Sequence, residues 1–175
     1  IDENIKLPIF QPLKLKNNQE AKEEIQQLKP DFILVAAYGQ ILPKDILDIA
    51  PCINLHASLL PNYRGASPIQ ESLLNDDSFT GVTSMLMEEG LDSGDILGFQ
   101  YLKITRTMEV SEAFEKLSHI AAQLTITTLD NFENINAIKQ NESLVTFCKK
   151  IKKDDGLVDF CDARKLFLKY KAYSY

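Results

Sequence analysis

Apolar residues along this chain follow two different periods, which together predict alternating strands and helices. The continuous run DFILVAAY, residues 31–38, is typical of a strand covered on both faces. From Glu109 to Phe132 the apolar residues recur at helical spacing, which predicts one long amphipathic helix. The same criteria predict further strands over 52–58, 80–88 and 96–104, and further helices from Asn17 (as cap) to Pro30, over 42–50 and from Ser67 to Leu74.

This order of elements predicts the α/β class, with a mostly parallel sheet that carries helices on both faces. In such sheets, ligands bind beyond the carboxyl ends of the strands. Gly39, Ser58 and Gly65 all fall at such ends. After residue 140 the character changes, and the last predicted helix, near residues 161–175, has no obvious core of its own.

Polar residues in the predicted strand 52–58 indicate a site. Asn54 and His56 project from one face because alternate strand residues share a face, and Ser58 follows at the start of a loop. Burying such groups without partners costs about 1–3 kcal/mol each. An amide and an imidazole suit acyl transfer, in which they stabilise an oxyanion or move protons. The missing carboxylate is best supplied by Asp92 of the turn GLDSGD, with Asp95 as its rival and a purely structural turn as the alternative.

Other polar residues are weaker candidates for a functional role. Ser58 lacks the G-x-S-x-G context of a nucleophile. Arg64 suits pairing with a carboxylate or phosphate, or simple exposure to solvent. The lysine-rich run 149–153 suits contact with phosphate, although a solvated face is the commoner outcome. His119 is expected on the surface of the long helix, without a chemical role.

Composition narrows the class of protein. The 175 residues carry a net charge of −6, which argues against a DNA-binding protein but leaves room for a local basic patch that meets RNA. The apolar stretches are too short to span a membrane, and no leader precedes them, so a cytoplasmic location is expected. The three cysteines lack the spacing of a zinc site or a disulfide framework, so free thiols are expected; a first residue other than Met suggests a fragment.

Four segments carry a family resemblance: AYGQILP, INLHASLLPNYRGASPIQ, TGVTSMLMEEGLDSGDIL and TFCKKIKKDDGLVDF. Together they closely resemble the methionyl-tRNA formyltransferases, within the wider family that uses 10-formyltetrahydrofolate. The resemblance implies a Rossmann-like formyltransferase sheet that lacks the family's first strand–helix–strand unit. It also implies a catalytic domain over residues 1–150, and over 151–175 a linker that leads to an absent C-terminal tRNA-binding domain.

The resemblance further implies a function and the residues that carry it. Asn54, His56 and Asp92 would be catalytic, in transfer of a formyl group from 10-formyltetrahydrofolate to the α-amino group of methionyl-initiator tRNA, without a metal. The folate would contact Ser58, Leu59, Leu60 and Pro61, with backbone of the AYGQILP loop and of the turn before Asp92 helping to hold the pterin. Two alternatives stay open: an amino-sugar nucleotide formyltransferase that uses the same donor, and an inactive folate-binding fragment.

Overall fold

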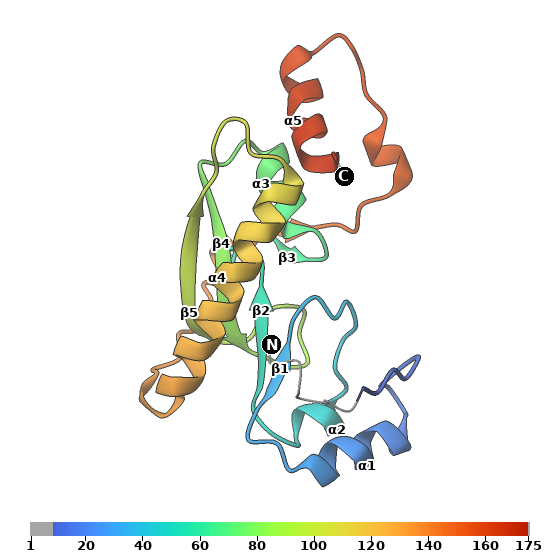
Figure 1. Ribbon diagram of the computed structural model, residues 1–175, viewed down its shortest axis with the longest axis vertical. Helices are drawn as coiled ribbons and strands as arrows, with labels where there is room; N and C mark the ends of the chain where they lie inside the picture. The colour runs from blue at the N-terminus through green and yellow to red at the C-terminus, as the bar shows by residue number, and fades with distance from the viewer. Residues whose placement is uncertain (1–8, 175) are drawn as a thin grey trace, which may run out of the picture.

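A four-stranded sheet organises the chain, as seen in a computed structural model that describes residues 9–174 (Figure 1). Residues 1–8 and 175, where the expected catalytic domain begins and the expected linker ends, lie outside the described residues. The strands of this sheet lie in the order β1 (Ile33–Val35), β2 (Cys52–His56), β4 (Phe79–Leu86) and β5 (Ile96–Lys103). The helices are α1 (Gln19–Leu28), α2 (Lys44–Leu47), α3 (Pro68–Leu74), α4 (Val110–Asn131) and α5 (Ala163–Tyr173), with 3-10 turns at Phe132–Asn134, Glu142–Leu144 and Lys153–Gly156.

The sheet confirms the α/β class but is mixed in direction. β1 and β2 are parallel, whereas β4 runs antiparallel to both of its neighbours, β2 and β5. The prediction of a mostly parallel sheet is therefore wrong for the described strands. The turn-rich connection 87–95 makes β5 antiparallel to β4, because it is too short for the crossover that two parallel neighbours need, whereas the longer connection through α3 permits either direction for β4.

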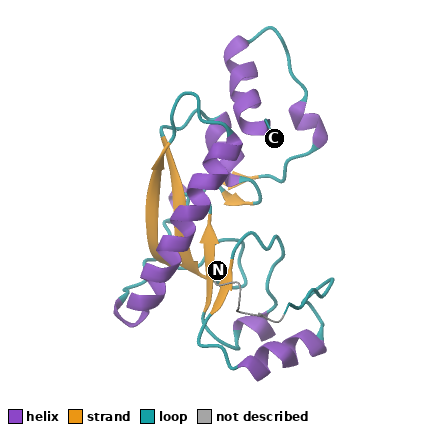
Figure 2. Cartoon of the chain, viewed as in Figure 1, coloured by secondary structure: helices purple, strands orange, loops and turns teal. Residues whose placement is uncertain are grey.

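Helices cover both faces of the sheet, as predicted. α4 packs along β4 and β5 (Figures 1 and 2), and α5 packs on α3 at one end of the molecule. The main core on this side consists of Ile69, Leu73, Val82, Met108, Val110, Ala113, Leu117, Leu124 and Ala172. On the opposite face, Ile46 of α2 packs with Val35 and Cys52. Leu60, from the loop after β2, packs there with Met85 and Ile96.

Two boundaries differ from the sequence prediction. Asn18, not Asn17, caps α1, since its side chain accepts a hydrogen bond from the backbone N of Ala21 at 3.1 Å. β1 is only three residues long because the chain turns away soon afterwards, through positive φ angles at Ala37 and Gly39. Within residues 9–174, no helix combines the length and apolar character needed to cross a membrane.

One small parallel ladder was not predicted. β3 (Arg64–Gly65) pairs with β6 (Phe147–Cys148), in register Arg64 with Phe147. Two-residue strands carry no periodicity, so the sequence offered no signal for this pairing. The ladder lies beside the site described next.

Candidate active site

Asn54, His56 and Asp92 meet at one point. Pairing with Met85 and Thr83 of β4 places Asn54 and His56 on the sheet face opposite α4. Asp92 reaches them from the turn between β4 and β5. The Asn54 Nδ2 donates to Asp92 Oδ1 at 3.4 Å, and His56 Nδ1 lies 3.7 Å from Asp92 Oδ2. The structure thus brings together all three residues that the sequence singled out.

The carboxylate of Asp92 is held in a largely dry environment. Its side chain is 14% exposed and that of His56 is 7% exposed. The backbone N of Gly65 donates to Asp92 Oδ2 at 2.8 Å, so both carboxylate oxygens have donors. Charges and dipoles interact more strongly here than in water, because little solvent screens them. The arrangement therefore presents a fixed negative charge beside an amide and an imidazole.

The second ring nitrogen of His56 is also engaged. His56 Nε2 lies 2.9 Å from the backbone oxygen of Tyr63, and because a carbonyl only accepts, Nε2 carries a proton. Nδ1 faces the Asp92 carboxylate at 3.7 Å, so both ring nitrogens have a polar neighbour. For the ring to donate to a substrate oxyanion, it must first release the carbonyl of Tyr63.

The turn that carries Asp92 has an unusual backbone. Asp92 itself adopts φ +48°, a left-handed conformation that aspartate tolerates better than most residues. A Cβ at Gly94 would overlap the carbonyl oxygen of Leu86, so only glycine fits there. Asp95, the rival, contributes its backbone oxygen to Leu86 N, and among the described contacts Asp92 alone of the two reaches Asn54 and His56.

The four residues suggested for folate contact form a wall next to these groups. Ser58 is fully buried, and its hydroxyl donates to the backbone oxygen of Asn62 at 2.5 Å, which does not suit a nucleophile. Leu60 is also buried, while Leu59 and Pro61 are half-buried. The accessible part of this wall is therefore Leu59 and Pro61.

Sequence reasoning missed the residues that surround the trio. Arg64 is 4% exposed and pairs with Glu142 at 2.7 Å, so the carboxylate alternative for this arginine is confirmed. Gln140 donates to the backbone oxygen of Asp92 from 48 residues away, and no local pattern signals such a contact. The N–H of Gly65 and the carbonyl of Tyr63 are backbone groups, whose roles a sequence does not display.

Among the described hydrogen bonds, the remaining candidates make none to Asn54, His56 or Asp92, although Cys148 Sγ donates to the Tyr63 carbonyl oxygen that His56 also contacts. His119 and the four lysines of the run 149–153 are exposed, as expected for a helix surface and a solvated face. Cys52, Cys148 and Cys161 are free thiols, and burial raises the pKa of the first two. Across residues 9–174, no group of three or more His, Cys, Asp or Glu side chains is placed to hold a metal ion.

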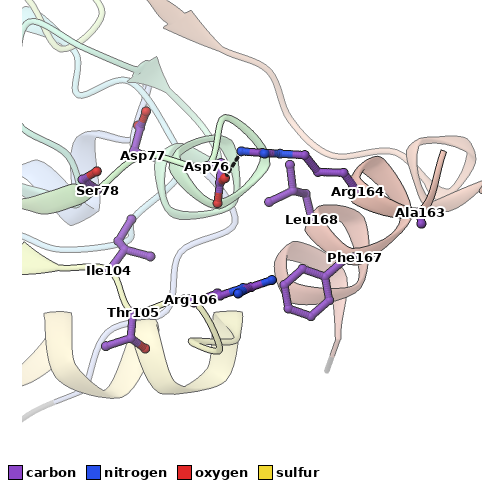
Figure 3. A pocket seen from close by; sticks show the side chains of 10 residues that line it. All are labelled: Asp76, Asp77, Ser78, Ile104, Thr105, Arg106, Ala163, Arg164, Phe167 and Leu168. Atoms are coloured by element: carbon purple, nitrogen blue, oxygen red, sulfur yellow. Dashed lines mark hydrogen bonds and ion pairs between the residues drawn. The ribbon is translucent and has the colours of Figure 1, made fainter.

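Two cavities lie near the ends of the sheet. One, of about 590 Å³, is bounded by residues 76–78, 104–106 and α5, and contains the ion pair of Arg164 with Asp76 (Figure 3). It flanks the start of β4 and the end of β5, whereas Asp92 lies at the opposite end of this hairpin. The other, of about 510 Å³, is lined by residues 40–44, Glu89, Lys14 and Lys16, and so connects the AYGQILP loop with the turn before Asp92.

The chain belongs to the formyl transferase family, and Asn54, His56 and Asp92 lie within the part of the chain that this family covers. The sequence pattern of the formyl transferase family matches residues 3–129. The chain is 56% identical over 173 residues to the methionyl-tRNA formyltransferase of a Nitratiruptor species, covering 99% of this chain and 57% of that protein. It is also 56% identical over 168 residues to the methionyl-tRNA formyltransferase of a strain of Campylobacter jejuni subsp. jejuni, covering 96% of this chain and 54% of that protein.

The chain therefore spans a little over half the length of the curated relatives it matches. Among solved structures, HypX from Aquifex aeolicus in complex with tetrahydrofolic acid superposes with a TM-score of 0.78 at 18% identity, over 87% of this chain and 27% of that one. A 4-N formyltransferase from Francisella tularensis superposes with a TM-score of 0.76 at 21% identity, over 92% and 66%. These likenesses confirm the Rossmann-like formyltransferase fold.

Proposed function

We propose that this chain carries the catalytic site of an enzyme that moves a formyl group from 10-formyltetrahydrofolate to the α-amino group of methionyl-initiator tRNA, in the cytoplasm. The observation that carries the proposal is the meeting of Asn54, His56 and Asp92 at one point. Identity of 56% to methionyl-tRNA formyltransferases supports this acceptor, while the 4-N formyltransferase from Francisella tularensis is a likeness of fold alone.

The donor is proposed to lie between the wall after β2 and the AYGQILP loop. The cavity that connects this loop with the turn before Asp92 suits the pterin, because Ile41, Leu42 and Pro43 line it on the side of the loop and Glu89 lines it on the side of the turn. Leu59 and Pro61 offer partly exposed apolar surface to a flat ring. Ser58 and Leu60 would support this wall from within, since both are buried.

The reaction begins when the uncharged amine attacks the formyl carbon. A nitrogen–carbon bond forms, and the carbonyl oxygen becomes an oxyanion; in this proposal the remaining N–H of Asn54 Nδ2 donates to it. Removing one such donor typically costs about 2.7–4 kcal/mol of transition-state stabilisation. His56 keeps the charge of Asp92 in place and reaches the oxyanion if its ring leaves the Tyr63 carbonyl.

Asp92 accepts the proton that the attacking amine must lose. The bond from the formyl carbon to folate N10 then breaks as the oxyanion collapses, and that nitrogen takes up a proton as it leaves. Formyl-methionyl-tRNA and tetrahydrofolate are the products, with no net change in oxidation state. A positioned acid–base group of this kind typically contributes about 10²–10⁴-fold to the rate.

We further propose that residues 1–150 form the catalytic part and that 151–175 form a linker toward a tRNA-binding part. The docking of α5 on α3 fits a linker that is fixed to the catalytic part rather than free of it.

The test supplies 10-formyltetrahydrofolate and charged initiator tRNA to this chain and to the longest form of the protein that can be expressed, and measures formyl-methionine. Transfer to tRNA supports the proposal. Transfer only to an amino-sugar nucleotide would replace the acceptor, and folate binding without any transfer by the longer form would contradict the enzymatic function.

A further inference from the structure

A segment beyond α4 contacts both the turn that carries Asp92 and the short strand β3. Residues 138–148, here called the strap, lie after residue 129, where the match to the formyl transferase family ends. At its start, Ile138 forms an antiparallel bridge with Ile96, with N···O distances of 2.8 and 2.9 Å. At its end, β6 pairs with β3, and Arg64 N donates to the oxygen of Thr146 at 2.9 Å. The strap is therefore bonded to β5, which follows the Asp92 turn, and to β3, whose Gly65 N donates to the Asp92 carboxylate.

Within the strap, Gln140 is aimed at the turn itself. Its side chain is buried, and its Nε2 donates to the backbone oxygen of Asp92 at 2.9 Å and to that of Gly94 at 2.8 Å. Both amide hydrogens are thus used on one turn. Two bonds, one at the catalytic residue and one two residues later, fix the position and the tilt of that turn.

The orientation of the Gln140 amide is set by Arg64. Arg64 Nε and Nη2 donate to Gln140 Oε1 at 3.0 and 2.9 Å, and Nη2 also donates to Glu142 Oε1 at 2.7 Å. A reversed amide would set its NH₂ against the guanidinium, donor against donor. The exposed carboxylate of Glu142 in turn holds the buried guanidinium, so every group of this network has a partner.

We infer that Gln140 is a positioning residue for formyl transfer, which keeps the backbone of the Asp92 turn where its carboxylate meets Asn54 and His56. Asp92 occupies a sparsely populated backbone region, and such conformations persist only where the surroundings fix them. Gln140 supplies that constraint without touching the reacting groups. This inference rests on the proposed function for its kinetic consequence.

The variant Gln140→Glu distinguishes the bond that the side chain accepts from Arg64 from the two bonds that it donates to the turn. A carboxylate retains the bond to Arg64, but it replaces the donor nitrogen with an oxygen that faces two carbonyl oxygens. Gln123→Glu, on the exposed surface of α4, introduces the same charge as a control. Gln140→Asn is a second variant: it keeps the amide but is one methylene too short to reach the turn and Arg64 together.

Formyl transfer is measured with the longest expressible form of the protein. Both Gln140 variants are expected to lose roughly 10- to 100-fold in kcat, because small misplacement of a catalytic group is costly. The fall in kcat should exceed any rise in the KM for 10-formyltetrahydrofolate, because Gln140 binds the turn at Asp92 and Gly94, whereas the proposed folate cavity meets this turn at Glu89. Gln123→Glu should match the unaltered protein.

Amide hydrogen exchange provides a readout that does not depend on turnover. Faster exchange confined to residues 88–95 in both Gln140 variants supports the inference, even if the unaltered protein proves inactive and the proposed function fails. Unchanged exchange there, or a kcat equal to that of the control, overturns it. Exchange that rises throughout the molecule, with kcat and KM altered together, also overturns it, because Gln140 would then support the fold as a whole.

Discussion

Replacing Asp92 with asparagine removes one negative charge from the site and leaves the shape of the side chain unchanged. Two donors point at the carboxylate: Gly65 N at 2.8 Å and Asn54 Nδ2 at 3.4 Å. An amide offers one oxygen where the carboxylate offers two, so one donor loses its acceptor. The closer bond to Gly65 should keep the oxygen, which sets the new NH₂ against Asn54.

The magnitude follows from these contacts. Loss of a hydrogen bond to a charged group costs about 1.5–3 kcal/mol of stability. Asparagine accepts a positive φ about as well as aspartate, so the turn should persist and the protein should still fold. Catalysis should suffer more, because the proposed proton acceptor is gone and the His56 ring loses its carboxylate neighbour. A fall of about 10²–10⁴-fold in kcat is expected, the usual contribution of a general base.

The assay is single-turnover formyl transfer to charged initiator tRNA, with thermal unfolding of the same sample recorded alongside. Asp95→Asn is the matched comparison, since it makes the same chemical change three residues away and leaves the contacts of Asn54 and His56 intact. A near-normal rate for Asp92→Asn, or a larger loss for Asp95→Asn, would refute the assignment of the base.

Three further predictions concern stability. Burial and the bond to Asp77 raise the pKa of Tyr63 to about 12, from a usual value of 10.0. The neutral phenol therefore stabilises the folded state fully below pH 10, and this stabilisation is lost as the pH rises toward 12. The urea midpoint should fall across that range, and Tyr63→Phe should flatten the fall. Gly65→Ala should destabilise by at least about 1–3 kcal/mol in urea titration and lower activity, because φ there is +122° and the new Cβ would overlap a carbonyl oxygen of β6; a neutral result would contradict the geometry. Leu117→Ala should cost about 2–5 kcal/mol by the same titration, whereas Ile126→Ala, exposed on the same helix, should cost little; equal losses would contradict the placement of α4.

The sequence predicted the meeting of Asn54, His56 and Asp92 better than it predicted the directions of the strands. Alternation along a strand is local, so it placed Asn54 and His56 on one face without knowledge of the fold. The direction of β4 depends on how the chain returns after α3, and a connection of that length permits either direction. Strand direction was therefore open until the neighbours of β4 were known.

No local sequence pattern could predict the hydrogen-bond network around Asp92. Arg64 looks the same in the sequence whether its guanidinium is buried or free, and the glutamine that binds it is 76 residues away. The bond from Gly65 to Asp92 uses a backbone N–H, which every residue but proline possesses. Such contacts depend on long-range packing, which composition and periodicity do not encode in a readable form.

The strap has a consequence for how the site matures as the protein is made. Its residues leave the ribosome after the whole sheet and α4 have been synthesised, yet they hold the turn between β4 and β5. In a nascent chain the sheet and α4 are thus complete before the residues that hold the Asp92 turn have been synthesised. Formation of the contacts that fix Asp92 is therefore tied to completion of this part of the polypeptide rather than to formation of the sheet.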